Sequence, residues 1–557
     1  MADLPDIDAV TLTVICARLE SITDEMDATL FRTALSPVIA DSHDASHGIY
    51  HPVSGGAVAQ GQHGHPIFVG VMSHAVSALL THTKQSGLRH GDVYLTNDPW
   101  ISGTHLQDMK AVAPVFIDGE LFCFLAGSGH WTDMGGPVPG NWNPTATDFH
   151  HEGMRVPFVR IVADGLIQED VLSIIMSNIR LADWADSDLR SELQVLAMGA
   201  RRIADLCREF GRETARASMD ALIERTATMM RAEVAAIPDG VYRFTDHLDN
   251  DGINETPLVI EVAVVVKGER LTLDFSGTSD RSAGPFNLSR PTFEAACFVA
   301  LKHVFADLPA NAGVMAPVDI IVPEKSLLNV KAPTAVGGYT EVSLRVIDAL
   351  FGALAKAVPQ NLWGASFGTV CSLVISGTEH DKVFVAFLYF GGGLGGCAEG
   401  DGLTHGPSAL SNSYIASVEL VEARFPLRFQ QWALRPDSGG DGQHRGGLGA
   451  TYAIELLAPK AVSFFVGDRA VFPPFGVQGG HSAATTDLRY CLDGNFMRPK
   501  LKSKADNIRM GRGDVVVLDT PGGGGYGDPK ERSITARKRD HLMGYVTKDL
   551  TGDAERT

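Results

Sequence analysis

The chain has 557 residues, of which 45% are hydrophobic and 20% charged, and its formal net charge at pH 7 is −19. A chain of this length exceeds one ordinary domain, so we expect two or three lobes. The negative charge disfavours nucleic acid or an anionic membrane surface as a partner, because both attract clustered lysine and arginine. No apolar run reaches the length of a membrane-spanning helix.

The first residues and the cysteines indicate the compartment. Residues 1–6 are acidic and lack the basic and apolar segments of a secretory signal peptide. The seven cysteines lie far apart and never form a Cys-x-x-Cys pair, which is typical of reduced thiols rather than of disulfides or a zinc ribbon. We therefore expect a cytoplasmic protein.

The first third of the chain is predicted to contain one long helix followed by short strands and loops. Apolar residues at helical spacing predict a helix over 10–35. Strands are expected near 55–60 and 91–95, and Asp118-Gly119 predicts a hairpin between strands at 112–116 and 121–126.

The rest of the chain changes pattern twice. A helical block over 168–237, broken near Gly211, precedes strands at 242–244, 258–266 and 271–275 and helices at 292–305 and 341–357; glycine-rich turns and strands fill the last 190 or so residues. These elements predict an α+β fold with several lobes. The expected boundaries are an N-terminal lobe over 1–165, a helical segment over 166–240, an α/β lobe over 241–360 and a glycine-rich, β-dominated lobe over 361–557.

Histidines mark the N-terminal lobe as a candidate metal-binding lobe. Twelve of the nineteen histidines precede residue 152, and histidine is the commonest transition-metal ligand near neutral pH. His105 and Asp108 lie three residues apart on a loop after a predicted strand, and pairing of the hairpin strands would place His130 beside them. Two imidazoles with one or two carboxylates suit Zn²⁺, Mn²⁺ or Fe²⁺. A His-x-x-Asp pair by itself is more often a hydrogen-bonded pair.

A series of ordered motifs runs along nearly the whole chain: Asn97-Asp98-Pro99, Gly103-Thr104-His105, Gly129-His130, Glu152-Gly153-Met154-Arg155-Val156-Pro157, Asp274-Phe275-Ser276-Gly277-Thr278-Ser279, Arg445-Gly446-Gly447-Leu448-Gly449 and the segment from Thr520 to Pro529. In this order the motifs resemble the hydantoinase B/oxoprolinase family, which also includes large subunits of acetone and acetophenone carboxylases.

The resemblance implies a metal site built from an upstream aspartate, the His-x-x-Asp pair and a later histidine. His105, Asp108 and His130 have the family's spacing. The upstream aspartate corresponds best to Asp44, with Asp41 as a competitor, because the family's Glu-Arg-Leu-Asp-Phe-Ser segment is Asp41-Ser42-His43-Asp44-Ala45-Ser46 in this chain.

Other polar residues near these motifs have two possible roles each. Asp133 is a candidate general base or an orienting partner of the site, and a structural turn role is equally compatible with its position. His47 is a candidate supporting residue for the metal ligands. His63 and His65 are candidates for lining a substrate pocket.

The resemblance also implies a partner. Similar proteins pair with a hydantoinase A-like ATPase subunit that uses ATP to phosphorylate an amide or ketone oxygen, in a hetero-oligomer such as a dimer of heterodimers. This chain contains no Gly-Lys dipeptide and hence no Walker A loop. The glycine runs at 391–396 and 522–525 could cradle phosphate, but without a lysine tight turns or partner contacts are the favoured interpretation.

The resemblance thus predicts the metal-binding subunit of an ATP-dependent hydrolase that opens a cyclic amide such as a hydantoin, a lactam or 5-oxoproline. The ion would activate a water or the carbonyl group. The first alternative is a subunit of an ATP-dependent ketone carboxylase. The second is a non-catalytic scaffold subunit, whose structural metal would be closed off by four protein ligands.

Overall fold

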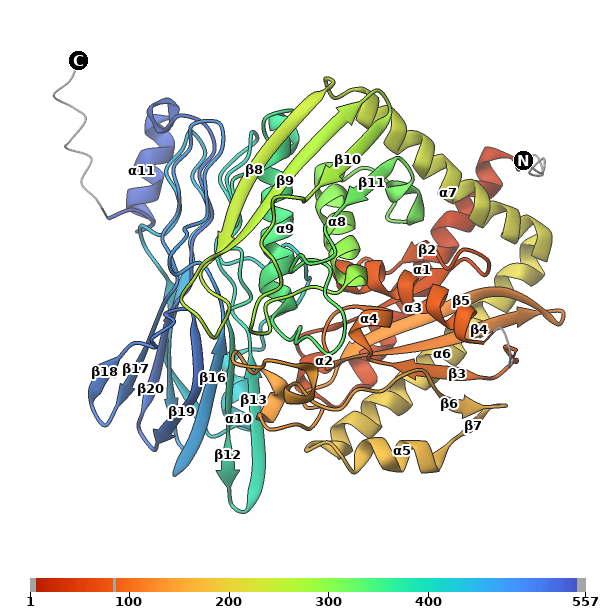
Figure 1. Ribbon diagram of the computed structural model, residues 1–557, viewed down its shortest axis with the longest axis horizontal. Helices are drawn as coiled ribbons and strands as arrows, with labels where there is room; N and C mark the ends of the chain where they lie inside the picture. Colours follow the sequence, from red (N-terminus) through yellow and green to blue (C-terminus); the bar gives the residue numbers. More distant parts are fainter. Residues whose placement is uncertain (1–6, 84–86, 548–557) are drawn as a thin grey trace.

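Four β-sheets and the helices between them make up residues 7–83 and 87–547, which the computed structural model describes (Figure 1). Residues 1–6, on which the expectation about a signal peptide depended, lie outside this range. Figure 1 shows the N-terminal elements at one end of the molecule, the C-terminal strands at the other, and α8 and α9 between them. The mixed helix-and-sheet fold class is confirmed.

The N-terminal sheet has seven strands in the order β2-β1-β5-β4-β3-β6-β7. Helices α1 (Ala9–Thr33) and α6 (Ala182–Phe210) pack on one face, and α3 (Pro66–His82) packs on the other. Side chains along each strand therefore alternate between two hydrophobic cores. The strands are β1 (Ala45–Tyr50), β2 (Ala57–Gln60), β3 (Val93–Thr96), β4 (Asp108–Ile117), β5 (Glu120–His130), β6 (Val159–Ala163) and β7 (Leu166–Ile167).

The predicted hairpin is present and places the candidate ligands. Asp118 and Gly119 have φ angles of 51° and 81°, the left-handed values that a tight two-residue β-turn requires. The turn sets the register of β4 and β5, in which Asp108 lies directly opposite His130. Because β1 pairs with the other side of β5 and begins at Ala45, opposite Gly129, the ends of three strands meet at this edge.

Helix α3 was missed by the sequence prediction, which expected only strands and loops there. Its buried residues, among them Ile67, Val71, Ala75 and Leu79, recur at helical spacing and pack against the sheet and α8 (Arg290–Val304). These positions carry the 3.6-residue apolar period, so the signal for this helix was present in the sequence and the prediction overlooked it. The predicted helical block is confirmed in type but consists of α5 (Glu169–Met176), α6 and α7 (Arg212–Ala235). The expected break at Gly211 is present.

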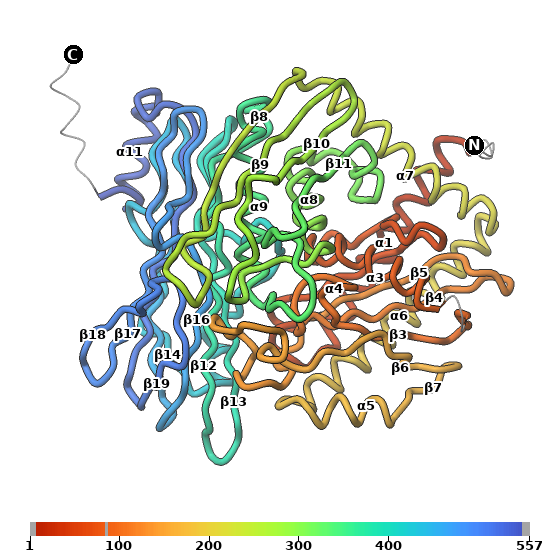
Figure 2. Tube along the Cα trace, viewed as in Figure 1, coloured from red at the N-terminus to blue at the C-terminus, as the bar shows by residue number. Residues whose placement is uncertain are grey.

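The middle of the chain forms a four-stranded sheet in the order β11-β10-β9-β8. Helix α9 (Tyr339–Leu354) packs between this sheet and α8, and all of its residues are buried. Figure 2 follows the chain through this central layer. The strands are β8 (Gly240–Leu248), β9 (Leu258–Lys267), β10 (Arg270–Asp274) and β11 (Val318–Ile321), and the short helices of the N-terminal half are α2 (Pro37–Ala40) and α4 (Pro99–Ser102).

The C-terminal region contains two sheets, with the orders β13-β12-β16-β19 and β14-β15-β20-β17-β18, that enclose a third hydrophobic core. The strands are β12 (Ser372–Glu379), β13 (Lys382–Leu388), β14 (Leu427–Leu434), β15 (Ala450–Leu456), β16 (Lys460–Val466), β17 (Asp487–Leu492), β18 (Asn495–Met497), β19 (Lys504–Gly511) and β20 (Val515–Asp519). Helices α10 (Val418–Arg424) and α11 (Ile534–Leu542) flank them.

Three glycine-rich segments of this region, residues 391–396, 446–449 and 522–525, form a layer in which backbone packs on backbone. Their amide groups bond from segment to segment; the Gly523 amide, for example, donates to the Gly447 carbonyl at 3.0 Å. Many of these N–H groups are therefore already hydrogen-bonded within the chain. Amides that bond in this way are not free to bind a phosphate, so the interpretation as a phosphate cradle is wrong for them.

The glycines of this layer are required for their small size rather than for a turn. A Cβ atom at Gly446 would lie 1.7 Å from the Gly523 carbonyl oxygen, and one at Gly393 would lie 2.0 Å from that of Gly447. None of the glycines in the three segments has a positive φ. These segments contain no tight turns, so that part of the expectation is wrong here, whereas partner contacts stay a prediction. Close approach of neighbouring backbones explains the composition.

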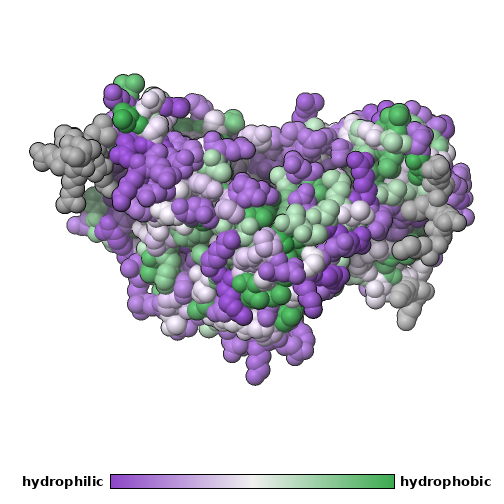
Figure 3. All heavy atoms as spheres, turned by 90° about the horizontal axis from the view of Figure 1, so that it is seen from above, coloured by the Kyte–Doolittle hydropathy of each residue, from purple (hydrophilic) through white to green (hydrophobic). Residues whose placement is uncertain are grey.

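Hydrophilic residues cover most of the face drawn in Figure 3, with small groups of hydrophobic residues between them. Within the described ranges, no helix combines the length and the apolar character needed to cross a bilayer.

Candidate metal centre

Three buried side chains of the N-terminal sheet converge on one point. His105 Nε2 lies 3.1 Å from Asp108 Oδ1, His130 Nδ1 lies 2.9 Å from the same oxygen, and the two ring nitrogens are 3.3 Å apart. The three residues are at most 3% exposed. The structure thus brings together the three candidate ligands that the sequence pattern singled out.

Strand pairing and a shaped loop place these side chains. Asp108 is the first residue of β4 and His130 the last of β5, so their side chains leave the same edge of the sheet. His105 lies on the loop before β4, where Gly103 has a φ of 73°. The buried Lys110 amine donates to the Gly103 carbonyl at 3.0 Å and to the Thr104 hydroxyl, which fixes this loop. Burial lowers the Lys110 pKa to about 8.

Aromatic side chains from distant parts of the chain enclose the cluster. The Tyr339 hydroxyl, at the start of α9, donates to Asp108 Oδ2 at 3.3 Å. The ring centroid of His105 lies 4.8 Å from that of Tyr339 and 5.3 Å from that of Trp142, and Phe387 lies 5.1 Å from His130. These contacts exclude water, which strengthens electrostatic interactions among the three ligands.

The pKa values of the cluster follow from burial and mutual contact. Burial alone would raise the pKa of Asp108, but His105 and the hydrogen bond from His130 outweigh it and hold this pKa well below its ordinary value. Burial lowers the pKa of His105. Burial also acts to lower the pKa of His130, but the hydrogen bond with Asp108 and the nearby charge of Asp44 raise it overall. Asp108 is thus held as an anion, the form that coordinates a cation.

The donor atoms fit a divalent transition metal. Ligand atoms about 2.1 Å from a tetrahedral ion lie about 3.4 Å from one another, close to the separations of 2.9–3.3 Å found here. Two imidazole nitrogens and a carboxylate oxygen form the mixed donor set that Zn²⁺, Mn²⁺ and Fe²⁺ accept. Within the described part of the chain, no other group of three or more histidine, cysteine or carboxylate side chains converges in this way.

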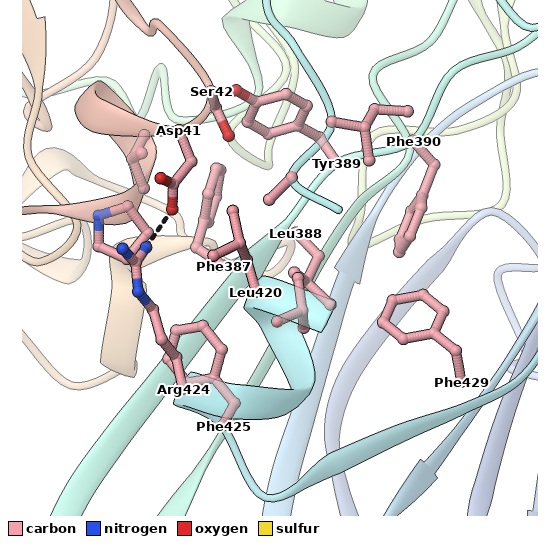
Figure 4. A pocket seen from close by; sticks show the side chains of 15 residues that line it. Asp41, Ser42, Phe387, Leu388, Tyr389, Phe390, Leu420, Arg424, Phe425 and Phe429 are labelled. Carbon is pink, nitrogen blue, oxygen red and sulfur yellow. Dashed lines mark hydrogen bonds and ion pairs between the residues drawn. The ribbon is translucent and has the colours of Figure 1, made fainter. Parts of the chain in front are cut away.

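The two candidate upstream aspartates have different surroundings. The Asp44 carbonyl accepts a hydrogen bond from the His130 amide at 3.0 Å, and its carboxylate lies 3.0 Å from His65 Nε2. Asp41 instead forms an ion pair with Arg424 on the wall of another pocket, as Figure 4 shows. Only Asp44 therefore lies beside the cluster, although its carboxylate contacts His65 rather than the three ligands.

His47 lies away from the cluster. Its ring lies between Asp27 of α1, at 2.7 Å, and Glu192 of α6, at 3.0 Å. Burial acts to lower the pKa of His47, but the Glu192 and Asp27 carboxylates raise it to about 10. This side chain therefore joins two helices to β1, and it does not contact the candidate ligands it was expected to support.

Asp133 has the contacts of a structural residue. Its buried carboxylate accepts hydrogen bonds from the amides of Gly135 and Gly140, at 2.8 and 2.9 Å, and forms an ion pair with Arg180 at 3.0 Å. Both oxygens are thus occupied by the loop that follows β5. Of the roles open to Asp133, this geometry favours the turn over the general base.

A cavity of about 600 Å³ lies next to the cluster, between residues 62–63, 389–391 and 405–415. His63 lines this cavity, and His65 lies behind its wall, where it contacts Ser413 at 2.7 Å and Asp44 at 3.0 Å. The rings of Tyr389, in the cavity wall, and of Phe387 link this cavity to His130. Tyr339, Phe387 and this cavity were not foreseen, because no local pattern connects residues so far apart in the chain.

Comparisons with known proteins identify the family of this chain. The family model described as hydantoinase B/oxoprolinase matches residues 8–529. An uncharacterized protein of Methanocaldococcus jannaschii is 30% identical over 95% of this chain and 92% of its own length. Caprolactamase subunit beta of Pseudomonas jessenii is 28% identical over 98% of this chain and 95% of its own length.

Two solved structures are similar along the whole chain. The crystal structure of the ATP-dependent caprolactamase from Pseudomonas jessenii has a TM-score of 0.90 at 26% identity, covering 97% of this chain and 95% of that chain. A structure of acetone carboxylase also has a TM-score of 0.90, at 19% identity, covering 98% of this chain and 79% of that chain; this likeness concerns the fold alone. The chain belongs to the hydantoinase B/oxoprolinase family.

Proposed function

We propose that this chain is the metal-binding subunit of an ATP-dependent hydrolase that opens a cyclic amide. The observation that carries the proposal is the buried His105, Asp108 and His130 cluster, which the rings of Phe387 and Tyr389 link to a cavity of about 600 Å³. Catalytic sites need both a strong local field and room for a substrate, whereas a structural metal needs only the ligands. The similarity to an ATP-dependent caprolactamase supports the amide as the bond attacked.

The three cluster residues would hold the ion, with Asp44 as the proposed fourth ligand. A divalent ion held there would act as a Lewis acid toward the amide carbonyl group. Tyr339 orients Asp108 through its hydroxyl, and the rings of Trp142 and Phe387 keep bulk water away. Asp133 fixes the loop after β5 and takes no proton in this scheme.

ATP is used by a second subunit in this proposal. Amides resist hydrolysis because resonance stabilises the carbonyl group, and phosphorylation of the oxygen removes that protection. The chain has no Walker A loop, and its caprolactamase relative is named as a subunit beta. A hydantoinase A-like ATPase in a hetero-oligomer, such as a dimer of heterodimers, would supply the activated amide.

The carboxylase and scaffold alternatives remain testable. The likeness to acetone carboxylase supports the common fold but no shared reaction at 19% identity. A closed structural site would not need the neighbouring cavity.

The test is ATP consumption by the chain together with its ATPase partner, over hydantoins, lactams, 5-oxoproline and ketones, with and without bicarbonate. We expect turnover on a cyclic amide without bicarbonate, and loss of that turnover in His105→Ala. Turnover that requires a ketone and bicarbonate would replace the hydrolase by the carboxylase. Full turnover in His105→Ala would support the scaffold.

A further inference from the structure

The cavity beside the metal centre is connected to it by two short chains of contacts. Along one, Ser413 of the cavity wall contacts His65, which contacts Asp44. Along the other, the ring of Tyr389 in the wall lies 5.9 Å from Phe387, and Phe387 lies 5.1 Å from His130. Figure 4 labels both side chains; Phe387 lies in β13, and Tyr389 follows its last residue. A molecule in this cavity would contact Tyr389 and Ser413, each of which is linked to the candidate site through one further side chain.

Aromatic rings and neutral polar groups line this cavity. Its aromatic residues are Phe367, Tyr389, Phe390, Tyr414 and Trp432. Serine and asparagine side chains at 408 and 411–413 supply hydroxyl and amide groups. No lysine, arginine, aspartate or glutamate contributes to the lining of this cavity. Flat rings stack well on such walls, and hydroxyl or amide groups satisfy a ring N–H and C=O.

His405, which also lines the cavity, is held as a neutral imidazole. Trp432 Nε1 lies 3.3 Å from His405 Nε2, and the Tyr452 hydroxyl contacts the same nitrogen. Because an indole nitrogen can only donate, the pairing with Trp432 favours an unprotonated Nε2. Burial lowers the pKa of His405, which keeps the ring uncharged at neutral pH. His405 therefore provides no cation to pair with a carboxylate.

We propose that this cavity binds the neutral, flat ring of a cyclic amide and discriminates against a ring that carries a carboxylate, such as 5-oxoproline. The inference rests on the proposed function for its link to the metal centre. A carboxylate that enters the cavity loses its water without gaining a lysine or arginine partner, because His63 and His405 are the only basic side chains of the lining, whereas an uncharged ring substituent loses far less. The formal net charge of −19 acts in the same direction.

The test compares two molecules that differ only in this charge, 5-oxoproline and its uncharged carboxamide, by titration calorimetry of the purified, metal-loaded chain at pH 7.5. We expect the carboxamide and hydantoin to bind, with 5-oxoproline weaker by about tenfold or more. Trp432→Phe should alter the fluorescence change that accompanies binding. Equal or tighter binding of 5-oxoproline, or no binding of any neutral ring by metal-loaded chain, would overturn the proposal.

A gain-of-charge variant sharpens this test. Tyr414 lines the cavity and is 56% exposed, so Tyr414→Arg adds a cation at a position that tolerates change. We expect this variant to bind 5-oxoproline at least about fivefold more tightly than Tyr414→Gln, its neutral control. Equal affinity in the two variants would count against the cavity as the binding site. If neutral rings bind as expected but no cyclic amide is turned over with the partner and ATP, the proposed function fails while this inference stands.

Discussion

Replacing His105 by alanine removes one of the three donors that meet within 3.3 Å. A zinc site with four protein ligands contributes about 10–16 kcal/mol of binding free energy, or roughly 3 kcal/mol for each ligand. The loss of one ligand should therefore weaken metal binding by about 100-fold. At a free metal concentration of about 100 times the native Kd, the ion stabilises the native fold by about 2.7 kcal/mol, and this falls to about 0.4 kcal/mol in the variant.

The assay has two readouts that do not depend on turnover. Metal content after dialysis against a weak chelator reports affinity, and the unfolding midpoint with and without added Zn²⁺ or Mn²⁺ reports the linked stabilisation. His150→Ala is the matched control, because His150 lies in the same lobe but its side chain is 71% exposed. If His105→Ala retains one ion with the native affinity, the three side chains do not form the metal site.

Three further predictions concern single residues. Asp44→Asn should lower metal affinity by about 10–100-fold whereas Asp41→Asn should leave it unchanged, measured by chelator competition; equal effects would refute the choice of Asp44. Gly523→Ala should lower the free energy of unfolding by about 1–3 kcal/mol or more in urea titrations, because its Cβ would lie 2.0 Å from a carbonyl oxygen. Gly400→Ala, whose Cβ meets nothing within 4 Å, is the control, and equal stability of the two variants would contradict the packing argument. His47→Gln should cost about 3–5 kcal/mol, because it leaves two buried carboxylates without their cation. The His47 pKa is about 10 in the folded chain, against about 6.5 unfolded, so its contribution is complete below pH 6.5 and is lost as pH rises through 10. The difference in stability between native chain and variant should thus shrink between pH 7 and pH 10.5, and a constant difference would contradict this pKa.

Local sequence patterns predicted elements that have one buried face and one exposed face, or that end in a recognisable turn. The hairpin was predicted from its Asp118-Gly119 turn, and helix α1 was predicted from apolar residues at helical spacing. Helix α3 carries the same kind of signal, with buried residues at 67–68, 71–72, 75–76 and 79, but the prediction overlooked it. The lobe boundaries stay a prediction.

The candidate site divides in the same way. His105, Asp108 and His130 lie within one hairpin and its loop, so spacing was enough to group them. Tyr339 and Phe387 reach the site only through the packing of α9 and β13, and the sequence carries no signal for that contact. The metal itself and the assignment of Asp44 as a ligand stay predictions. The spacing of ligand residues shows which side chains can converge, but it does not show that an ion binds to them.

The glycine layer affects how the protein folds during its synthesis. Gly524 of this layer packs on Gly364, which lies outside the three segments and 160 residues earlier in the chain. At a synthesis rate of about 5–20 residues per second, roughly 8–32 s pass between the synthesis of Gly364 and that of Gly524. The layer has few side chains that could collapse early, so its unpaired amides stay open to water and to chaperones during that interval. Translation speed over the last third of the message should therefore govern the yield of native protein more strongly than speed over the first third.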